Sequence, residues 1–215
     1  MILVFDTSTN MLAIGLANET GELVGHFRAL ASPNERGIHD ARLASETDKL
    51  LREAGAKASE IERIGVIIGP GSFTGLRIGL SFAKGLALAT GAGIVPLTQH
   101  EVMKEEMPDF GDYIITPGYR PDLLYFAETE SPRSIQLLKM EEFLKLPKQP
   151  ALVHHLCSTE KIADIAERTS IFLMPSLSVM VNMTATSTEV LSGDSLGSLE
   201  PLYITEFQPM NRQLS

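Results

Sequence analysis

Short apolar runs alternate along this chain with longer segments in which apolar residues recur every three or four positions. An apolar run bounded by turn residues predicts a strand, and the longer spacing predicts an amphipathic helix. In the first half, strands are predicted at 2–6, 11–17, 22–28, 64–68 and 94–97, with helices at about 39–54 and 73–90. The first half is therefore expected to run β-β-β-α-β-α-β.

The second half repeats this order of elements without visible similarity of residues. Strands are predicted at 112–116, 123–127, 134–138, 151–156 and 171–174, with short helices at 141–146 and 159–168 and a further helix starting near Ser176. Three antiparallel strands followed by α/β crossovers form the ribonuclease-H-like layout, and two tandem copies form the actin-like fold. We therefore predict an α/β protein of two lobes, each a mixed five-stranded sheet with helices. The first lobe is expected to span 1–103 and the second, divergent lobe 104–215, with the last segment free to pack back on the first lobe.

The composition is that of a globular protein, because 44% of the 215 residues are apolar and 21% are charged. A single cysteine, Cys157, excludes an internal disulfide and is typical of a reducing compartment. No basic leader precedes the first apolar run, and the apolar stretch 73–95 contains Arg77 and Lys84. We therefore expect a cytoplasmic protein without membrane contact.

The balance of charge argues against unaided nucleic acid binding. Acidic residues outnumber basic ones 27 to 18, the net charge is −9, and no basic run is present. A protein that grips RNA or DNA by itself normally concentrates Lys and Arg on one face. Contact with nucleic acid would therefore need a partner that supplies the positive surface.

A glycine-rich turn joins a predicted strand to a predicted helix in the stretch IIGPGSFTG at 67–75. It fails as a P-loop, because Thr74 and Gly75 stand where that motif needs Gly and Lys, and Thr74 also replaces the third glycine of a dinucleotide fingerprint. The free N–H groups at the helix start still favour an anion. Alternatively, Ser72 caps the helix and the segment is an ordinary tight turn. The first turn of the chain leaves the same two interpretations open. The candidates for facing an anion or nucleotide are Asp6, Thr7, Ser8, Gly69, Gly71 and Ser72.

Small residues recur every four positions in the helix that follows this turn, at Gly75, Gly79, Ala83 and Ala87. Glycine in a helix interior costs up to about 1 kcal/mol relative to alanine, so the stripe predicts close packing against another backbone. If that backbone belongs to the chain's own sheet, the neighbouring stripe of Leu76 and Leu80 is expected to face another subunit. On this interpretation, Gly79→Leu or Leu80→Glu would abolish subunit pairing and leave the fold largely intact.

Four stretches of the chain resemble the bacterial TsaB (YeaZ) family of tRNA threonylcarbamoyladenosine biosynthesis. They are FDTST at 5–9, GPGSFTGLRIG at 69–79, IVPLTQHE at 94–101 and LEPLYI at 199–204. The resemblance runs through most of the chain, and the stretch at 69–79 is its most specific part. Between about 105 and 195 only the layout agrees.

The resemblance implies an actin-like (ASKHA) protein with a non-catalytic role. Such a protein supports its paralogue TsaD, which transfers a threonylcarbamoyl group to adenosine 37 of tRNAs reading ANN codons. TsaC and the ATPase TsaE complete the machinery, and tRNA is reached only through the complex. The resemblance places the partner surface on the first two helices, which could also form a homodimer when the chain is alone. The interface candidates are His39, Arg42, Leu50, Leu76, Arg77, Gly79, Leu80, Ala83 and Lys84.

The sequence departs from the pattern of the catalytic paralogue at a metal site. TsaD carries an H-x-x-x-H metal pair, whereas here His100 is followed four residues later by Lys104. A lone imidazole is a poor metal site, so no metal is expected. No cofactor should be required by this chain, and a weak contact with ATP or ADP at a subunit interface is left open.

Other features are less specific. The family often has His-Ser-Glu at the start of the first helix, where this chain has His39-Asp40-Ala41, so any role of that triplet does not transfer. The acidic side chains at 101, 105 and 106 are expected to form a solvated helix face. Two alternative functions remain open: a small ATPase or phosphotransferase that uses Asp6 and the glycine turn, and, less favoured, a peptidase that acts on partner proteins.

Overall fold

A five-stranded mixed sheet organises the first half of the chain, in the order β3-β2-β1-β4-β5. The computed structural model describes residues 1–31, 38–120, 122–146, 150–154 and 170–204. The elements of this half are β1 (Ile2–Asp6), β2 (Met11–Ala17), β3 (Leu23–Leu30), α1 (Ile38–Glu53), the 3-10 helix η1 (Ala58–Glu60), β4 (Arg63–Gly69), α2 (Phe73–Thr90) and β5 (Gly93–Thr98). Strands β1 to β3 pair antiparallel, and β4 and β5 continue the sheet in parallel with β1. The predicted order of elements is confirmed, with small shifts at their ends.

A second five-stranded sheet has the same plan, in the order β10-β9-β6-β7-β8. Its elements are β6 (Tyr113–Pro117), β7 (Leu123–Glu128), β8 (Gln136–Lys139), the short helix α4 (Met140–Phe143), β9 (Ala151–His154) and β10 (Ser170–Leu173). Counted from the antiparallel edge, both sheets place the third, second, first, fourth and fifth strand of their half in the same sequence. This confirms the actin-like α/β fold. The helix predicted at 159–168 and the last two residues of the strand predicted at 151–156 lie outside the described residues.

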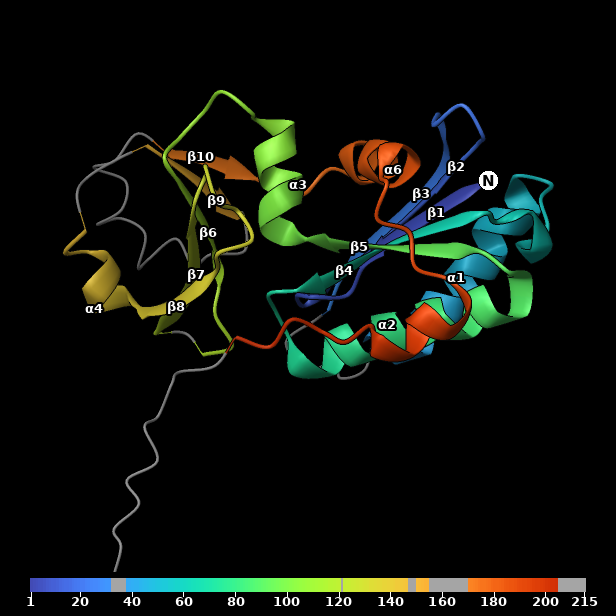
Figure 1. Cartoon of the computed structure of the whole chain (residues 1–215), viewed down its shortest axis with the longest axis horizontal. Coiled ribbons are helices and arrows are strands. Elements are labelled where there is room, and N and C mark those ends of the chain that lie inside the picture. The colour runs from blue at the N-terminus through green and yellow to red at the C-terminus, as the bar shows by residue number, and fades with distance from the viewer. Residues whose placement is uncertain (32–37, 121, 147–149, 155–169, 205–215) are drawn as a thin grey trace, which may run out of the picture.

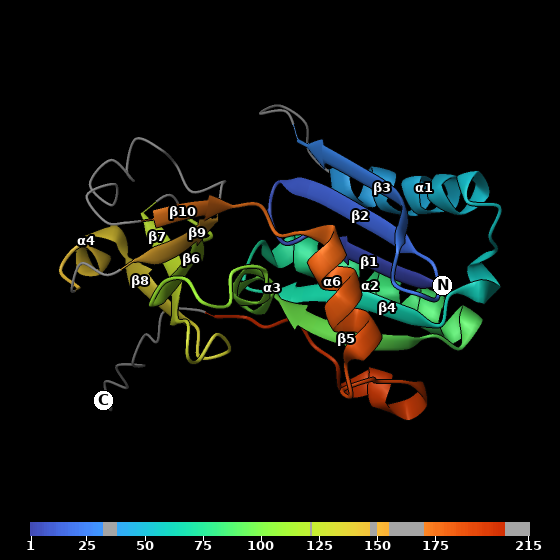
Figure 2. The ribbon, with the colours of Figure 1, turned by 90° about the horizontal axis from the view of Figure 1, so that it is seen from above.

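Two helices link the two lobes. Helix α3 (Gln99–Glu106) joins the sheets, and the division expected at 103/104 falls inside it. Helix α6 (Leu177–Thr186) begins after the cap Ser176, near the predicted start, and is followed by the 3-10 helix η2 (Gly193–Ser198). Although α6 follows the second sheet in sequence, it packs on the first one, opposite α1 and α2 (Figure 1, Figure 2). None of the described helices is long and apolar enough to cross a membrane.

The strand β1 explains why the first lobe has two apolar layers. Successive side chains of a strand point to opposite faces of the sheet. Leu3 and Phe5 join the core under α1 and α2, whereas Ile2 and Val4 join the core under α6. A strand that is covered on both faces appears in sequence as a continuous apolar run, as ILVFD does.

The C-terminal segment, defined here as residues 199–204, lies along α2 and corrects one expectation. Leu202 N–H donates to Ile68 O at 2.7 Å, which fixes the segment beside β4. Leu199 joins the core cluster that also contains Leu80. Leu76 and Leu80 are only 1% and 4% exposed, so the stripe expected to face another subunit is covered by the chain itself.

Candidate functional site

The first turn of the chain and the glycine turn touch each other at the carboxyl ends of β1 and β4. Ser72 N–H donates to Ser8 O at 2.6 Å, and Thr7 Oγ1 donates to Gly75 O at 2.8 Å. A Cβ added to Gly71 would lie 2.2 Å from Ser8 O, and one added to Gly75 would lie 2.0 Å from Thr7 O. The glycines therefore serve the close approach of two backbones, as the stripe of small residues predicts, and one N–H of the helix start is used inside the chain.

The carboxylate of Asp6 is a buried acceptor at the centre of this contact. It accepts Ser8 N–H at 2.7 Å, the Ser8 hydroxyl, and Gln99 Nε2 at 3.3 Å. Burial raises the pKa of Asp6, and its hydrogen bonds act in the opposite direction. Because Gln99 is the first residue of α3, Asp6 ties the first strand to the connection between the lobes.

A cleft of about 600 Å³ opens beside the two turns, between the lobes. Its described lining residues are Ser8, Thr9, Asn10, Ala31, Ile38, His39, Gly71, Ser72, Phe73, Thr74, Pro117, Gly118 and Tyr119. Of the anion-facing candidates, Ser8, Gly71 and Ser72 line this cleft, whereas Asp6, Thr7 and Gly69 are buried. These lining residues supply hydroxyl and amide groups but no Lys, Arg, Asp or Glu. The described lining of the cleft thus offers no lysine or arginine for a triphosphate and no carboxylate for Mg²⁺.

His100 occupies the junction between α3 and the second sheet. The imidazole is fully buried, and its Nε2 lies 3.1 Å from Thr116 Oγ1 on β6. Burial lowers the pKa of His100 to about 3, with a smaller contribution from His154. Lys104, four residues later, donates to Pro108 O at 2.6 Å. Across the described residues there is no group of three or more His, Cys, Asp or Glu side chains that could hold a metal ion.

The acidic face expected on α3 is wrong for two of its three members. Glu101 accepts from Thr98 N–H and bonds to Arg133, which also pairs with Glu189. Glu106 accepts Ser176 N–H at 3.1 Å, at the start of α6, and only Glu105 is exposed. Sequence patterns missed the contacts of Glu101 with Arg133 and of Glu106 with Ser176 because these partners lie 32 and 70 residues away along the chain.

Arg28 on β3 makes a further polar contact with the segment that connects the two lobes. Its Nη2 donates to Pro175 O at 2.9 Å, between the second sheet and α6. Burial lowers the pKa of Arg28, and the nearby carboxylates of Asp6 and Glu106 act in the opposite direction. No local sequence pattern predicts this role for Arg28, which lies on the edge strand β3.

The interface candidates separate into buried and outward-facing groups. Five of them are buried in the chain's own core and are not available as a surface: Leu50, Leu76, Gly79, Leu80 and Ala83. His39, Arg42, Arg77 and Lys84 are at least partly accessible. Two apolar side chains that the sequence analysis did not select, Phe73 and Leu88, are 53% and 73% exposed on α2.

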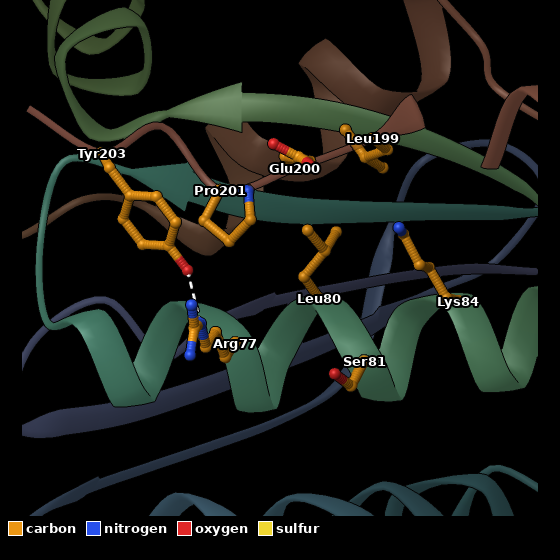
Figure 3. Close-up of a pocket in the computed structure, with 8 residues that line it drawn as sticks. All are labelled: Arg77, Leu80, Ser81, Lys84, Leu199, Glu200, Pro201 and Tyr203. Atoms are coloured by element: carbon orange, nitrogen blue, oxygen red, sulfur yellow. Dashed lines mark hydrogen bonds between the residues drawn. The ribbon is translucent and has the colours of Figure 1, made fainter. Parts of the chain in front are cut away.

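A groove runs between α2 and the C-terminal segment, as Figure 3 shows. We call it the α2 groove; its volume is about 300 Å³, and it is lined by Arg77, Leu80, Ser81, Lys84, Leu199, Glu200, Pro201 and Tyr203. Arg77 Nε donates to the Tyr203 hydroxyl at 2.7 Å. The guanidinium carbon of Arg77 also lies 3.8 Å from the centre of the Phe73 ring. Arg77 is one of the predicted interface residues, whereas Phe73 and Tyr203, the aromatic residues that hold it, are not.

Comparison with known proteins identifies one family model and several relatives. The family model matched by residues 35–109 is "TsaD: tRNA N6-adenosine threonylcarbamoyltransferase". A Haemophilus influenzae protein named tRNA threonylcarbamoyladenosine biosynthesis protein TsaB is 27% identical over 130 residues, covering 59% of this chain and 52% of that protein. The Escherichia coli protein of the same name is 37% identical over 87 residues, covering 40% of this chain and 35% of that protein. The matches thus span about half or less of the length of these relatives.

A solved structure supports the fold over nearly the whole chain. YeaZ from Pseudomonas aeruginosa superposes with a TM-score of 0.71 at 18% identity, covering 94% of this chain and 99% of that one. At this level of identity the likeness concerns the fold. It includes the second lobe, almost all of which lies outside the family-model match at residues 35–109.

Proposed function

We propose that the chain is a member of the TsaB (YeaZ) family and a non-catalytic subunit of tRNA threonylcarbamoyladenosine biosynthesis. In this role it pairs with TsaD and is required for threonylcarbamoyl transfer to adenosine 37 of tRNAs that read ANN codons. One observation carries the proposal: residues 35–109 match the transferase family itself, yet His100 is directed to Thr116, and Lys104 stands where the transferase is expected to carry a second metal-binding histidine. A paralogue of the transferase that keeps only one of the paired histidines is suited to supporting it.

The side chains at the expected metal position support a structural role. A metal-binding imidazole needs a nitrogen that is accessible to the ion and a second ligand nearby. Here Nε2 of His100 is directed to Thr116, its Nδ1 is buried away from solvent, and Lys104 is a cation bonded to Pro108 O. We infer that this position holds the two lobes together instead of activating a substrate.

The partner surface in this proposal is the outward side of α1 and α2. It presents His39, Arg42, Arg77 and Lys84 together with the exposed Leu88. Exposed apolar side chains among polar ones are typical of a protein–protein interface. TsaD occupies this surface in the complex, and a second copy of the chain does so when TsaD is absent. TsaC and TsaE act in the same machinery, and a weak ATP or ADP contact at the subunit interface belongs to the same proposal.

With a net charge of −9, the chain is expected to meet tRNA only through the complex, in the cytoplasm. The test is reconstitution of TsaC, TsaD and TsaE from one organism with and without this chain. We expect modified tRNA only when the chain is present, measured by mass spectrometry of tRNA nucleosides. Equal yields with and without the chain would reject the proposal.

A further inference from the structure

The α2 groove holds a guanidinium whose orientation is fixed before any partner arrives. Arg77 lies over the Phe73 ring at 3.8 Å and donates its Nε to Tyr203 at 2.7 Å, while the Phe73 and Tyr203 rings stack with centroids 4.8 Å apart. In the described part of the chain, neither Nη atom of Arg77 has a hydrogen-bond partner. An arginine held in this way loses little side-chain entropy when it binds a planar anion with both Nη groups.

Two further donors follow Arg77 along the same wall of the groove. Ser81 lies one turn beyond Arg77, and Lys84 lies two turns beyond it, as Figure 3 shows. Among the described residues, Lys84 makes no ion pair or hydrogen bond. At a rise of about 1.5 Å per residue, the two cations are separated by about 10 Å along the helix axis.

The opposite wall and the floor restrict what this pair of cations can bind. Pro201 and Leu199 form an apolar wall, and the floor is Leu80. Glu200 adds one negative charge to the groove. A nucleic acid backbone needs an extended basic surface, whereas this groove offers two cations beside an acid in a chain with a net charge of −9. Two isolated cations with apolar side chains between them instead complement a protein segment with spaced carboxylates.

We propose that the α2 groove is a docking site for an acidic segment of a protein partner, with two carboxylates about 10 Å apart that pair with Arg77 and Lys84. Such a spacing occurs between residues two turns apart on a helix. The inference rests on the proposed function, since the partner it assigns is the transferase subunit TsaD, and it adds the chemistry by which that partner is recognised.

The test measures binding of the full-length chain to purified TsaD by isothermal titration calorimetry at 50 and 300 mM NaCl. Arg77→Gln and Lys84→Gln should each weaken binding at least five-fold at low salt, and the double variant should lose most of the salt dependence. Lys145→Gln, which removes an exposed lysine of the other lobe, is the matched control and should stay within two-fold. Arg77→Lys should recover only part of the loss, because lysine cannot form the two-pronged contact.

The outcomes separate this inference from the proposed function. If the unaltered chain does not bind TsaD, both the proposed function and the docking site are overturned. If the unaltered chain binds but both glutamine variants bind equally well, only the docking site is overturned. A loss confined to tRNA binding by the complex would assign the groove to nucleic acid and would also overturn it. Lys84→Gln controls for misfolding of Arg77→Gln, because Lys84 lies outside the contact of Arg77 with Phe73 and Tyr203. The circular dichroism spectrum of each variant should match that of the unaltered chain.

Discussion

At the scale of single residues, close contact with the first turn of the chain explains why α2 contains glycines where it does. The Oγ1 atom of Thr7 would lie 2.3 Å from a Cβ on Gly79, and the same hydroxyl donates to Gly75 O. The hydroxyl therefore cannot turn away without losing its acceptor. This corrects the expectation that Gly79→Leu would spare the fold, because the side chain would enter the contact between α2 and the first turn.

Gly79→Ala is predicted to destabilise the protein by about 1–3 kcal/mol, because the added methyl overpacks against Thr7. Gly85 provides a matched control on the same helix, where a Cβ would meet nothing within 4 Å. Gly85→Ala should instead stabilise the protein by up to about 1 kcal/mol, since alanine favours the helix. Urea unfolding of the three proteins gives both free energies. Equal losses for the two variants would contradict the packing argument.

At the scale of elements, α2 has apolar side chains in two directions, and both are used. One side faces the sheet and the first turn, and the other is covered by the C-terminal segment. An amphipathic helix with two apolar sides needs two neighbours. The second neighbour is supplied by a segment more than a hundred residues later in the chain, which no local pattern predicts.

Leu80→Ala is predicted to cost about 2–5 kcal/mol, because Leu80 is 4% exposed and belongs to the main core cluster. Leu88→Ala, two turns later, removes the same atoms from a side chain that is 73% exposed. The free energy of unfolding should then change by no more than about 0.5 kcal/mol. Measured stabilities that fall equally for both variants would show that the C-terminal segment does not cover α2 in solution.

At the scale of the whole molecule, buried polar contacts connect the lobes through α3 and the start of α6. His100 approaches Thr116, Glu106 accepts Ser176 N–H, and Arg28 donates to Pro175 O. Such contacts are directional, so they favour one relative placement of the lobes more than apolar packing does. Their cost is desolvation, which appears as shifted pKa values.

His100 makes the protein less stable in acid. Its pKa is lowered to about 3 in the fold, against an ordinary value of about 6.5. Between these values the unfolded chain binds a proton that the folded protein excludes, so stability falls as the pH falls through 6.5. From pH 7 to pH 5 this amounts to about 2 kcal/mol.

The measurement is the free energy of unfolding at pH 7 and pH 5 for the unaltered chain, for His100→Gln and for His26→Gln. His100→Gln should lose less stability on acidification than the unaltered chain. His26 is an exposed histidine on β3, so His26→Gln should behave like the unaltered chain. Identical pH dependence in all three proteins would exclude a buried neutral imidazole at position 100.

The sequence by itself determined the order of the elements, both sheets and the actin-like fold. Apolar runs, helical spacing and glycine turns act within a few residues, so they can be interpreted locally. The role of small residues in α2 was also predictable, because Gly75 and Gly79 needed a close neighbour. Which backbone they would meet was left open.

Only the tertiary structure decided which surfaces stay free. Leu76 and Leu80 were expected to face outward, but both are buried, and Leu80 packs in one cluster with Leu199 of the C-terminal segment. Glu101 and Glu106 were expected to be solvated, but they bind Arg133 and the Ser176 N–H, which are distant in the sequence. The orientation of Arg77 likewise depends on Tyr203. The physical reason is common to these cases: burial and hydrogen bonding are settled by residues that are remote in sequence, whereas periodicity reports only on the segment that carries it.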